Sequence, residues 1–229
     1  CSRRKRSPIG HVKTVAIVQQ YERTMSTPSL FSDKRELLPF DGSALLIPHF
    51  ISSVESAKLF TQLNEETPWE MPEMVMFGKK YPQAGFSTWF TDTNVSYVYS
   101  GITRTPHAMT PLLQDVMRQC ALASGAEYNS VLVNLYRDGS DSVSWHSDNE
   151  DVNGSEPTIA SVSLGATRRF DLRHKESGET VRVDLEDGSL LVMSGLSQHC
   201  WVHQIAKTKA KVGPRINLTF RRVVTSQQS

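Results

Sequence analysis

The residues of this chain best suited to chemistry are two histidines, an aspartate and two arginines in its C-terminal half. His146-Ser147-Asp148 is followed by His203 and then by Arg215 and Arg221. Two imidazoles and one carboxylate can hold a non-haem Fe(II) ion on one face and leave the opposite coordination positions open. An arginine offers a fixed charge on a planar fork, which suits an acidic co-substrate. The pattern therefore predicts an iron centre beside a carboxylate-binding site.

The residues alone leave the third metal ligand open. His199 and His203 lie four positions apart with Cys200 between them, so a small zinc site is an alternative. A closed zinc site needs four protein ligands at short spacings, and the sequence has no Cys-x-x-Cys partner for it. On an extended strand the two histidines would face the same way, so spacing does not choose between them.

The last predicted strand has one polar and one apolar face. Along it, Arg215, Asn217, Thr219 and Arg221 alternate with Ile216, Leu218 and Phe220. A sheet exposed to water would show the same alternation, whereas inside a barrel the polar face would be a ligand-binding wall. At about 3.3 Å per residue the two arginine Cα atoms lie roughly 20 Å apart, so inward-leaning side chains could reach either end of a short dicarboxylate.

Two helices are expected ahead of this region as structural supports. Ser52-Ser53-Val54-Glu55 is typical of a capping box and opens an apolar stripe that ends at Leu63. Thr110-Pro111 predicts an N-cap followed by proline at the first helical position, and Gly125 predicts the end of that helix.

From about Asn129 the apolar period changes to two, which predicts short strands. They fall at 131–133, 159–164, 170–172, 181–185, 190–193 and 215–221, with a turn signal at Asp187-Gly188. Because no helical crossover separates them, they favour an antiparallel sandwich or jelly roll, in a mainly β (α+β) domain.

Composition sets broader limits. Hydrophobic residues make up 38% and charged residues 21%, and the formal net charge is +1, so any affinity for nucleic acid must come from local basic patches. No apolar run is long enough to span a bilayer. Three widely spaced cysteines fit a reducing compartment, and we expect an intracellular protein, nuclear or cytoplasmic, without a membrane. Because the first residue is Cys1, we expect a fragment of a larger protein.

We expect three parts along the chain. Residues 1–36 read as a basic, flexible arm, in which Arg3-Arg4-Lys5-Arg6 is either a solvated end or a nuclear or phosphate-binding signal. Residues 37–224 form the main domain, and 225–229 a frayed tail. Within the domain, 69–100 is rich in aromatic residues. It is either a set of hairpins packed on a barrel or a lid that stacks on a flat ligand.

Several motifs together resemble the AlkB family of Fe(II)/2-oxoglutarate-dependent dioxygenases. They are Asn134-x-Tyr136, His146-x-Asp148-x-Glu150, 160–165 (ASVSLG), Trp201-Val202-His203 and 215–221 (RINLTFR). The similarity extends, more weakly, over about 38–222. In the family pattern His203, and not His199, aligns with the metal ligand.

The resemblance implies a double-stranded β-helix, or jelly roll, with Fe(II) on His146, Asp148 and His203. It implies that Arg215 pairs with the distal carboxylate of 2-oxoglutarate, and that Arg221 supports the inner carboxylate and Asp148. The co-substrate would also meet Asn134, Tyr136 and Asn217.

The implied reaction is oxidative demethylation of 1-methyladenine or 3-methylcytosine. It would use Fe(II), 2-oxoglutarate and O2 and release formaldehyde, succinate and CO2. Glu150 stands at the position that meets the alkylated base, and Tyr99 resembles the stacking position. Arg168, Arg169, Arg173, His174 and Lys175 are candidates for phosphate contacts.

Pro82-Gln83 departs from the basic pair of many members, which favours single-stranded RNA or DNA as substrate for a monomer that needs no membrane. A 2-oxoglutarate oxygenase of protein or lipid would not need Tyr99 or Glu150. A non-catalytic nucleic-acid-binding module is expected to lack a ligand or an arginine, and none is missing here.

Overall fold

The computed structural model describes residues 33–71, 73–76, 79–82, 85–92, 97–99, 102–104 and 106–224, with side chains for 33–71, 85–92 and 106–224. The tail expected at 225–229 and most of the arm expected at 1–36 lie outside these residues. At the end of the expected arm, Arg35–Glu36 already form strand β1 and pair with the next strand.

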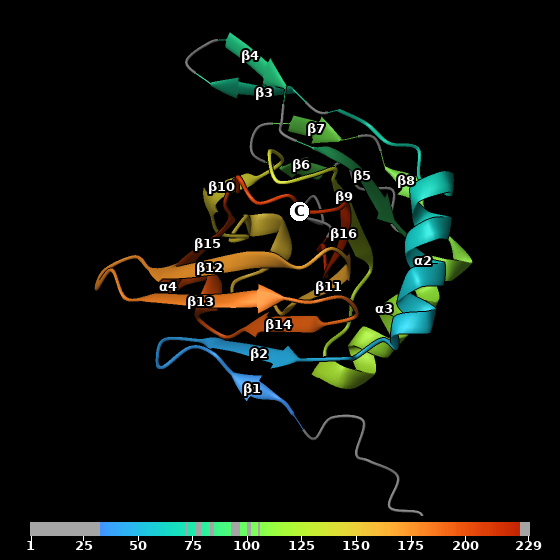
Figure 1. Cartoon of the computed structure of the whole chain (residues 1–229). Coiled ribbons are helices and arrows are strands. Elements are labelled where there is room, and N and C mark those ends of the chain that lie inside the picture. Colours follow the sequence, from blue (N-terminus) through green and yellow to red (C-terminus); the bar gives the residue numbers. More distant parts are fainter. Residues whose placement is uncertain are drawn as a thin grey trace, which may run out of the picture. The chain divides into compact units, whose positions relative to one another are not determined.

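The larger of two main sheets has eight strands (Figure 1). Its spatial order is β1-β2-β14-β11-β16-β9-β5-β8, antiparallel throughout except between β5 and β8. The strands are β1 (Arg35–Glu36), β2 (Ser43–Ile47), β5 (Phe86–Thr91), β8 (His107–Ala108), β9 (Ser130–Tyr136), β11 (Ile159–Gly165), β14 (Leu190–Ser194) and β16 (Arg215–Arg221).

The second main sheet has the order β10-β15-β12-β13, with antiparallel neighbours. Its strands are β10 (Val143–His146), β12 (Arg168–His174), β13 (Thr180–Leu185) and β15 (Trp201–Ile205). One buried apolar cluster takes residues from both sheets, such as Leu46 and Leu191 from the larger and Leu172 and Trp201 from the smaller. Two antiparallel sheets closed over a shared core make a jelly roll, so the predicted mainly β fold is confirmed.

Two helices cover the other face of the larger sheet, where they lie together along one side (Figure 1). In α2 (Ser53–Glu66) the side chain of Ser52 accepts from the backbone of Glu55, and in α3 (Pro111–Ser124) Thr110 caps the start and Gly125 the end. Both predicted helices are therefore confirmed at their caps. The apolar face of β16 packs on this helical side, so its polar face points into the jelly roll.

Shorter elements complete the described chain. They are the hairpins β3 (Glu73–Met76) with β4 (Lys79–Pro82) and β6 (Tyr97–Tyr99) with β7 (Ile102–Arg104), the 3-10 turn η1 (Asp151–Asn153) and the helical turn α4 (Ser197–Cys200). In the described part of the chain, no helix is long and apolar enough to cross a membrane.

All six predicted strands are present, but the other strands of the two main sheets, β1, β2, β5, β8, β10 and β15, were not predicted. Strand β5 lies second from the edge of the larger sheet, between β9 and β8, and its Trp89 and Phe90 are buried in apolar clusters. For these two aromatic residues of the 69–100 segment the packing alternative holds. Strand β10 is short and only half-buried, which leaves it without the clear apolar alternation that marks the other strands.

Candidate metal and co-substrate site

The three expected metal ligands meet between the two sheets. His146 ends β10, Asp148 lies in the loop that follows, and His203 is the central residue of β15, directly opposite His146 in the β10–β15 pairing. Their ligand atoms all lie within 4.8 Å of one another. Strand pairing thus places the two imidazoles side by side, and the loop after β10 places the carboxylate of Asp148 next to them.

The proton on His146 sits on the nitrogen that faces away from this cluster. Its Nδ1 lies 2.8 Å from the carbonyl oxygen of Ser144. A carbonyl oxygen can only accept, so Nδ1 carries a hydrogen, and Nε2 is the nitrogen that faces the cluster. That Nε2 lies 4.0 Å from Oδ1 of Asp148. The hydrogen bond thus selects the tautomer in which His146 can ligate a metal.

The charge states of the other two residues also suit metal binding. Burial alone would raise the pKa of Asp148, but the charge of Arg221, and then the two histidines, lower that pKa to about 2. Arg221 Nη2 donates to Oδ2 of Asp148 at 2.7 Å. Burial, followed by the effect of His146, lowers the pKa of His203 to about 3. At neutral pH the site therefore offers one anionic carboxylate and neutral imidazole.

The donor set fits Fe(II). Oδ1 of Asp148 is buried and has no hydrogen-bond partner within the described residues. A buried carboxylate oxygen without a partner is costly unless a cation fills its place. Two imidazoles and a carboxylate grouped on one side of a cavity form the facial arrangement that non-haem iron takes.

The cavity extends from these residues along the polar face of β16. It is lined by all eight residues expected to bind metal or co-substrate, together with Thr219: Asn134, Tyr136, His146, Asp148, His203, Arg215, Asn217, Thr219 and Arg221. The alternative of a water-exposed polar face on β16 is thereby wrong, since all seven of its residues are buried.

Arg215 lies at the end of the cavity away from the metal cluster. Its Nη2 donates to Oγ of Ser163 at 3.0 Å, and its guanidinium carbon lies 5.2 Å from the centre of the Tyr136 ring. Nε and Nη1 are buried without a hydrogen-bond partner in the described part of the chain. Burial lowers the pKa of Arg215 to about 10, so it remains a cation at neutral pH. A buried cation with two donor groups unpaired within the described residues is suited to bind a carboxylate.

Unlike Arg215, Asn217 uses its side-chain donors in hydrogen bonds within the protein. Its Nδ2 donates to Oγ of Ser161 at 2.8 Å and to the carbonyl of Val162 at 2.9 Å, while its Oδ1 accepts from Thr219. The side chain joins β16 to β11 and borders the cavity without a free N–H.

The expected substrate residues are described only in part. Tyr99 belongs to β6, and its side chain lies outside the described residues, as does Gln83. Glu150 is half-buried in the loop after Asp148. Burial, and then the nearby Asp148 carboxylate, raise its pKa. Glu150 therefore lies close to the carboxylate of Asp148, and its role toward the base stays a prediction.

The five basic residues separate into two groups. Arg168 is buried and donates to three backbone carbonyls, those of Asp138, Asp141 and Ala206, and His174 is buried as well. The prediction that Arg168 and His174 contact phosphates is wrong, because their polar atoms already make hydrogen bonds within the protein. The exposed members are Arg169, Arg173 and Lys175.

The structure separates His199 from His203. Residues 197–200 form the turn α4, so the extended strand assumed through His199 is wrong. His199 is exposed and its Nε2 makes a short hydrogen bond to the carbonyl of Ser155, whereas His203 faces the cavity. Helical geometry rotates the two side chains apart, which spacing alone did not reveal.

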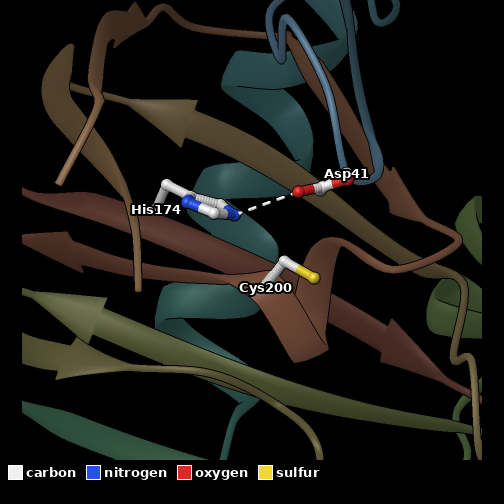
Figure 2. A group of neighbouring side chains, drawn as sticks. All are labelled: Asp41, His174 and Cys200. Carbon is white, nitrogen blue, oxygen red and sulfur yellow. Dashed lines mark ion pairs between the residues drawn. The ribbon is translucent and has the colours of Figure 1, made fainter. Parts of the chain in front are cut away.

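A second group of potential ligands consists of Asp41, His174 and Cys200 (Figure 2). His174 and Asp41 point toward each other, with Nε2 and Oδ2 3.3 Å apart. Here Nδ1 accepts from the backbone N–H of Ser177, so the proton sits on Nε2 and points at Asp41. This is the opposite tautomer from His146, and it makes the group a hydrogen-bonded pair that fastens the Asp41 loop.

Gln198 supports the three candidate metal ligands, and it was not identified from the sequence. It is 1% exposed, and its Oε1 accepts from the backbone N–H of Asp148 at 2.9 Å. Lys175 Nζ donates to the carbonyls of Gln198 and His199, which holds α4 in place. No local pattern marks Gln198, because its partner lies 50 residues earlier.

Comparisons with known proteins agree with this geometry. Residues 43–221 match the family model described as the 2OG-Fe(II) oxygenase superfamily. The chain is 38% identical over 188 residues to the alpha-ketoglutarate-dependent dioxygenase alkB homolog 3 of Bos taurus, covering 78% of this chain and 65% of that protein. It is 34% identical to the DNA oxidative demethylase ALKBH2 of Mus musculus, covering 76% and 77%.

A solved structure described as that of OsALKBH1 shares the fold. It superposes with a TM-score of 0.59 at 16% identity, over 78% of this chain and 97% of that one. The chain spans 65% of the length of the bovine alkB homolog 3.

Proposed function

Because the chain belongs to the AlkB family of the 2OG-Fe(II) oxygenase superfamily, we propose that it removes N-methyl groups from nucleic-acid bases by oxidation. The single observation that carries the proposal is the continuous cavity. It joins a facial His-Asp-His cluster at one end to a buried arginine with unused donors at the other.

Fe(II) and 2-oxoglutarate, when bound, supply the oxidant that adds one atom of O2 to the methyl carbon of the substrate. In that reaction 2-oxoglutarate would be converted to succinate and CO2, which accounts for the second oxygen atom. The N-hydroxymethyl group then breaks at its C–N bond, leaving formaldehyde and the unmodified base. The protein contributes binding, orientation and a dry cavity.

The protein side chains would divide this work. His146, Asp148 and His203 hold the metal, and Arg221 keeps Asp148 ionised by its 2.7 Å hydrogen bond. Arg215 is the buried cation available to the distal carboxylate of the co-substrate. A charge-assisted pair of this kind fixes the co-substrate in orientation as well as in position.

The substrates we propose are 1-methyladenine and 3-methylcytosine in single-stranded RNA or DNA. Both bases are cations, and Glu150 provides a half-buried carboxylate beside the metal cluster. The aromatic segment 69–100, apart from the core strand β5, is proposed as a lid in which Tyr99 stacks on the extracted base.

Formaldehyde release tests the proposal. Wild-type protein with Fe(II), ascorbate and 2-oxoglutarate is offered methylated and unmethylated oligonucleotides, and formaldehyde and succinate are measured together. Equimolar release from the methylated strand alone is expected. Succinate without formaldehyde from any methylated nucleic acid would leave an oxygenase of another substrate class, such as protein or lipid.

A further inference from the structure

The loop after the metal ligand Asp148 is fixed to the larger sheet through η1. Val152 packs against the apolar cluster of Trp89, Leu132 and Val223. The backbone N–H of Val224 donates to the carbonyl of Val152 at 2.8 Å. This anchors the turn from both its side chain and its backbone, so the residue that follows has a rigid position.

That residue is Asn153, and its amide reaches two residues of the site. Nδ2 donates to Oε2 of Glu150 at 3.0 Å and lies 3.5 Å from the carbonyl oxygen of Asp148. The carbonyl can only accept, so the amide nitrogen, not the oxygen, faces this pair. The backbone N–H of Asn153 also donates to the carbonyl of Glu150 at 2.8 Å.

The oxygen of the Asn153 amide lies in a less favourable environment than the nitrogen. Asn153 is 5% exposed, and its Oδ1 is buried without a hydrogen-bond partner in the part of the chain that the structure describes. An apolar side chain of similar size would avoid that unpaired oxygen. The residue is therefore better explained by what its Nδ2 holds than by packing.

We propose that Asn153 is a specificity-determining positioning residue, which holds the carboxylate of Glu150 in one orientation for a cationic methylated base. The inference rests on the proposed function. A carboxylate that is already held loses less conformational freedom when the base arrives. The hydrogen bond from Nδ2 holds the carboxylate through Oε2. The same amide links Glu150 to the backbone of Asp148, so it would also fix the position of the base relative to the residues that would hold the metal.

Asn153→Asp tests this with almost no change in shape, because it replaces the donor by an oxygen that repels Glu150. The readout is kcat/KM for single-stranded oligonucleotides carrying 3-methylcytosine, a cation, or 3-methylthymine, which is neutral. We expect the ratio of the two to fall at least tenfold. Decarboxylation of 2-oxoglutarate without nucleic acid is measured alongside, so that a general loss of the co-substrate reaction is distinguished from a change in the ratio.

Asn149→Asp is the matched control. It adds the same charge four residues away in the same loop, where Asn149 is exposed and its Oδ1 accepts from Oγ of Ser147, a contact that Asp keeps. The ratio should remain at the wild-type value. An equal loss on both bases in Asn153→Asp, or an unchanged ratio, would overturn the inference.

A double-mutant cycle separates positioning from packing, and it uses Asn153→Ala, which removes the donor and the unpaired oxygen together. Asn153→Ala should lower the ratio in the wild-type background and leave it unchanged beside Glu150→Gln. The same fall in both backgrounds would show that Asn153 acts independently of Glu150. If wild-type protein released formaldehyde from neither base, the proposed function itself would fall; activity with an unaltered ratio overturns only the role of Asn153.

Discussion

Arg221 donates a hydrogen bond to Asp148 across 73 residues of sequence, and both side chains are buried. The guanidinium lies on the polar face of β16, and the carboxylate belongs to the loop after β10. The pair thus connects the wall of the co-substrate cavity to the metal cluster, and it keeps the carboxylate anionic although burial opposes ionisation.

Arg221→Met should therefore affect both stability and metal binding. Removing one partner of a buried ion pair typically costs about 3–5 kcal/mol of unfolding free energy. The Mn(II) dissociation constant at pH 7 should rise because Asp148 then binds a proton more readily. Chemical denaturation and calorimetry measure the two effects.

The neighbouring Arg222 supplies the control for that variant. Arg222 pairs with Glu127 on the surface, where both side chains are mostly exposed. Arg222→Met should change the unfolding free energy by no more than about 1 kcal/mol. Similar losses of unfolding free energy in the two variants would mean that the buried pair stabilises the protein no more than the surface pair does.

His146→Ala, Asp148→Ala and His203→Ala should each abolish turnover, because each removes one of three ligands on a single ion. His199→Ala should retain most activity, since its ring is exposed and hydrogen-bonded to the Ser155 carbonyl, and it does not line the cavity. Formaldehyde assays and metal titration measure both. We expect one ion per chain, and Cys200→Ser should not alter that number. An inactive His199→Ala beside an active His203→Ala would reverse the ligand assignment.

Arg215→Ala should weaken 2-oxoglutarate binding at least tenfold, because losing a buried charge-assisted partner typically costs about 2–5 kcal/mol. Affinity for the nucleic acid should change little, which provides an internal control. Ser163→Ala removes only the hydroxyl that accepts from Arg215, so a smaller effect is expected. An unchanged 2-oxoglutarate dissociation constant in Arg215→Ala would exclude the residue from the site.

The metal-free protein should lose stability as the pH falls from about 6.5 toward 3. His203 has a folded-state pKa of about 3 against its ordinary 6.5, so the unfolded chain binds more protons in this window. The depressed pKa of Asp148, about 2 against 3.8, extends the loss below pH 4. His203→Gln should flatten the fall in thermal midpoint between pH 7 and 4.5. Identical slopes in the two proteins would contradict the assignment.

Single strands should be demethylated faster than duplex DNA, because a methylated base outside a duplex needs no extraction from a base pair. Tyr99→Ala should slow this reaction without changing 2-oxoglutarate affinity, since we confine its role to the base. Initial rates on single-stranded RNA, single-stranded DNA and duplex carrying 1-methyladenine measure the preference. Equal or faster rates on duplex would refute it.

Local patterns were sufficient for the helices and for much of the site. Capping residues and apolar period depend on neighbours a few positions away, so α2, α3 and the six C-terminal strands followed from the sequence. Residue chemistry also indicated an iron centre, since two imidazoles and a carboxylate are a donor set that non-haem Fe(II) uses, whereas the choice of His203 over His199 came from the family resemblance.

Only the tertiary structure decided how those side chains are used. The tautomer of His146 depends on the Ser144 carbonyl. The burial of both faces of β16 depends on the layers that flank it. Arg168 cannot contact phosphate because it donates to three carbonyls that are distant in sequence. The hydrogen bond from Asn153 to Glu150 depends on the packing that holds η1 against the larger sheet. Sequence specifies which groups are present, but hydrogen bonds between remote segments form only once the sheets have paired, and they set each group's orientation and charge.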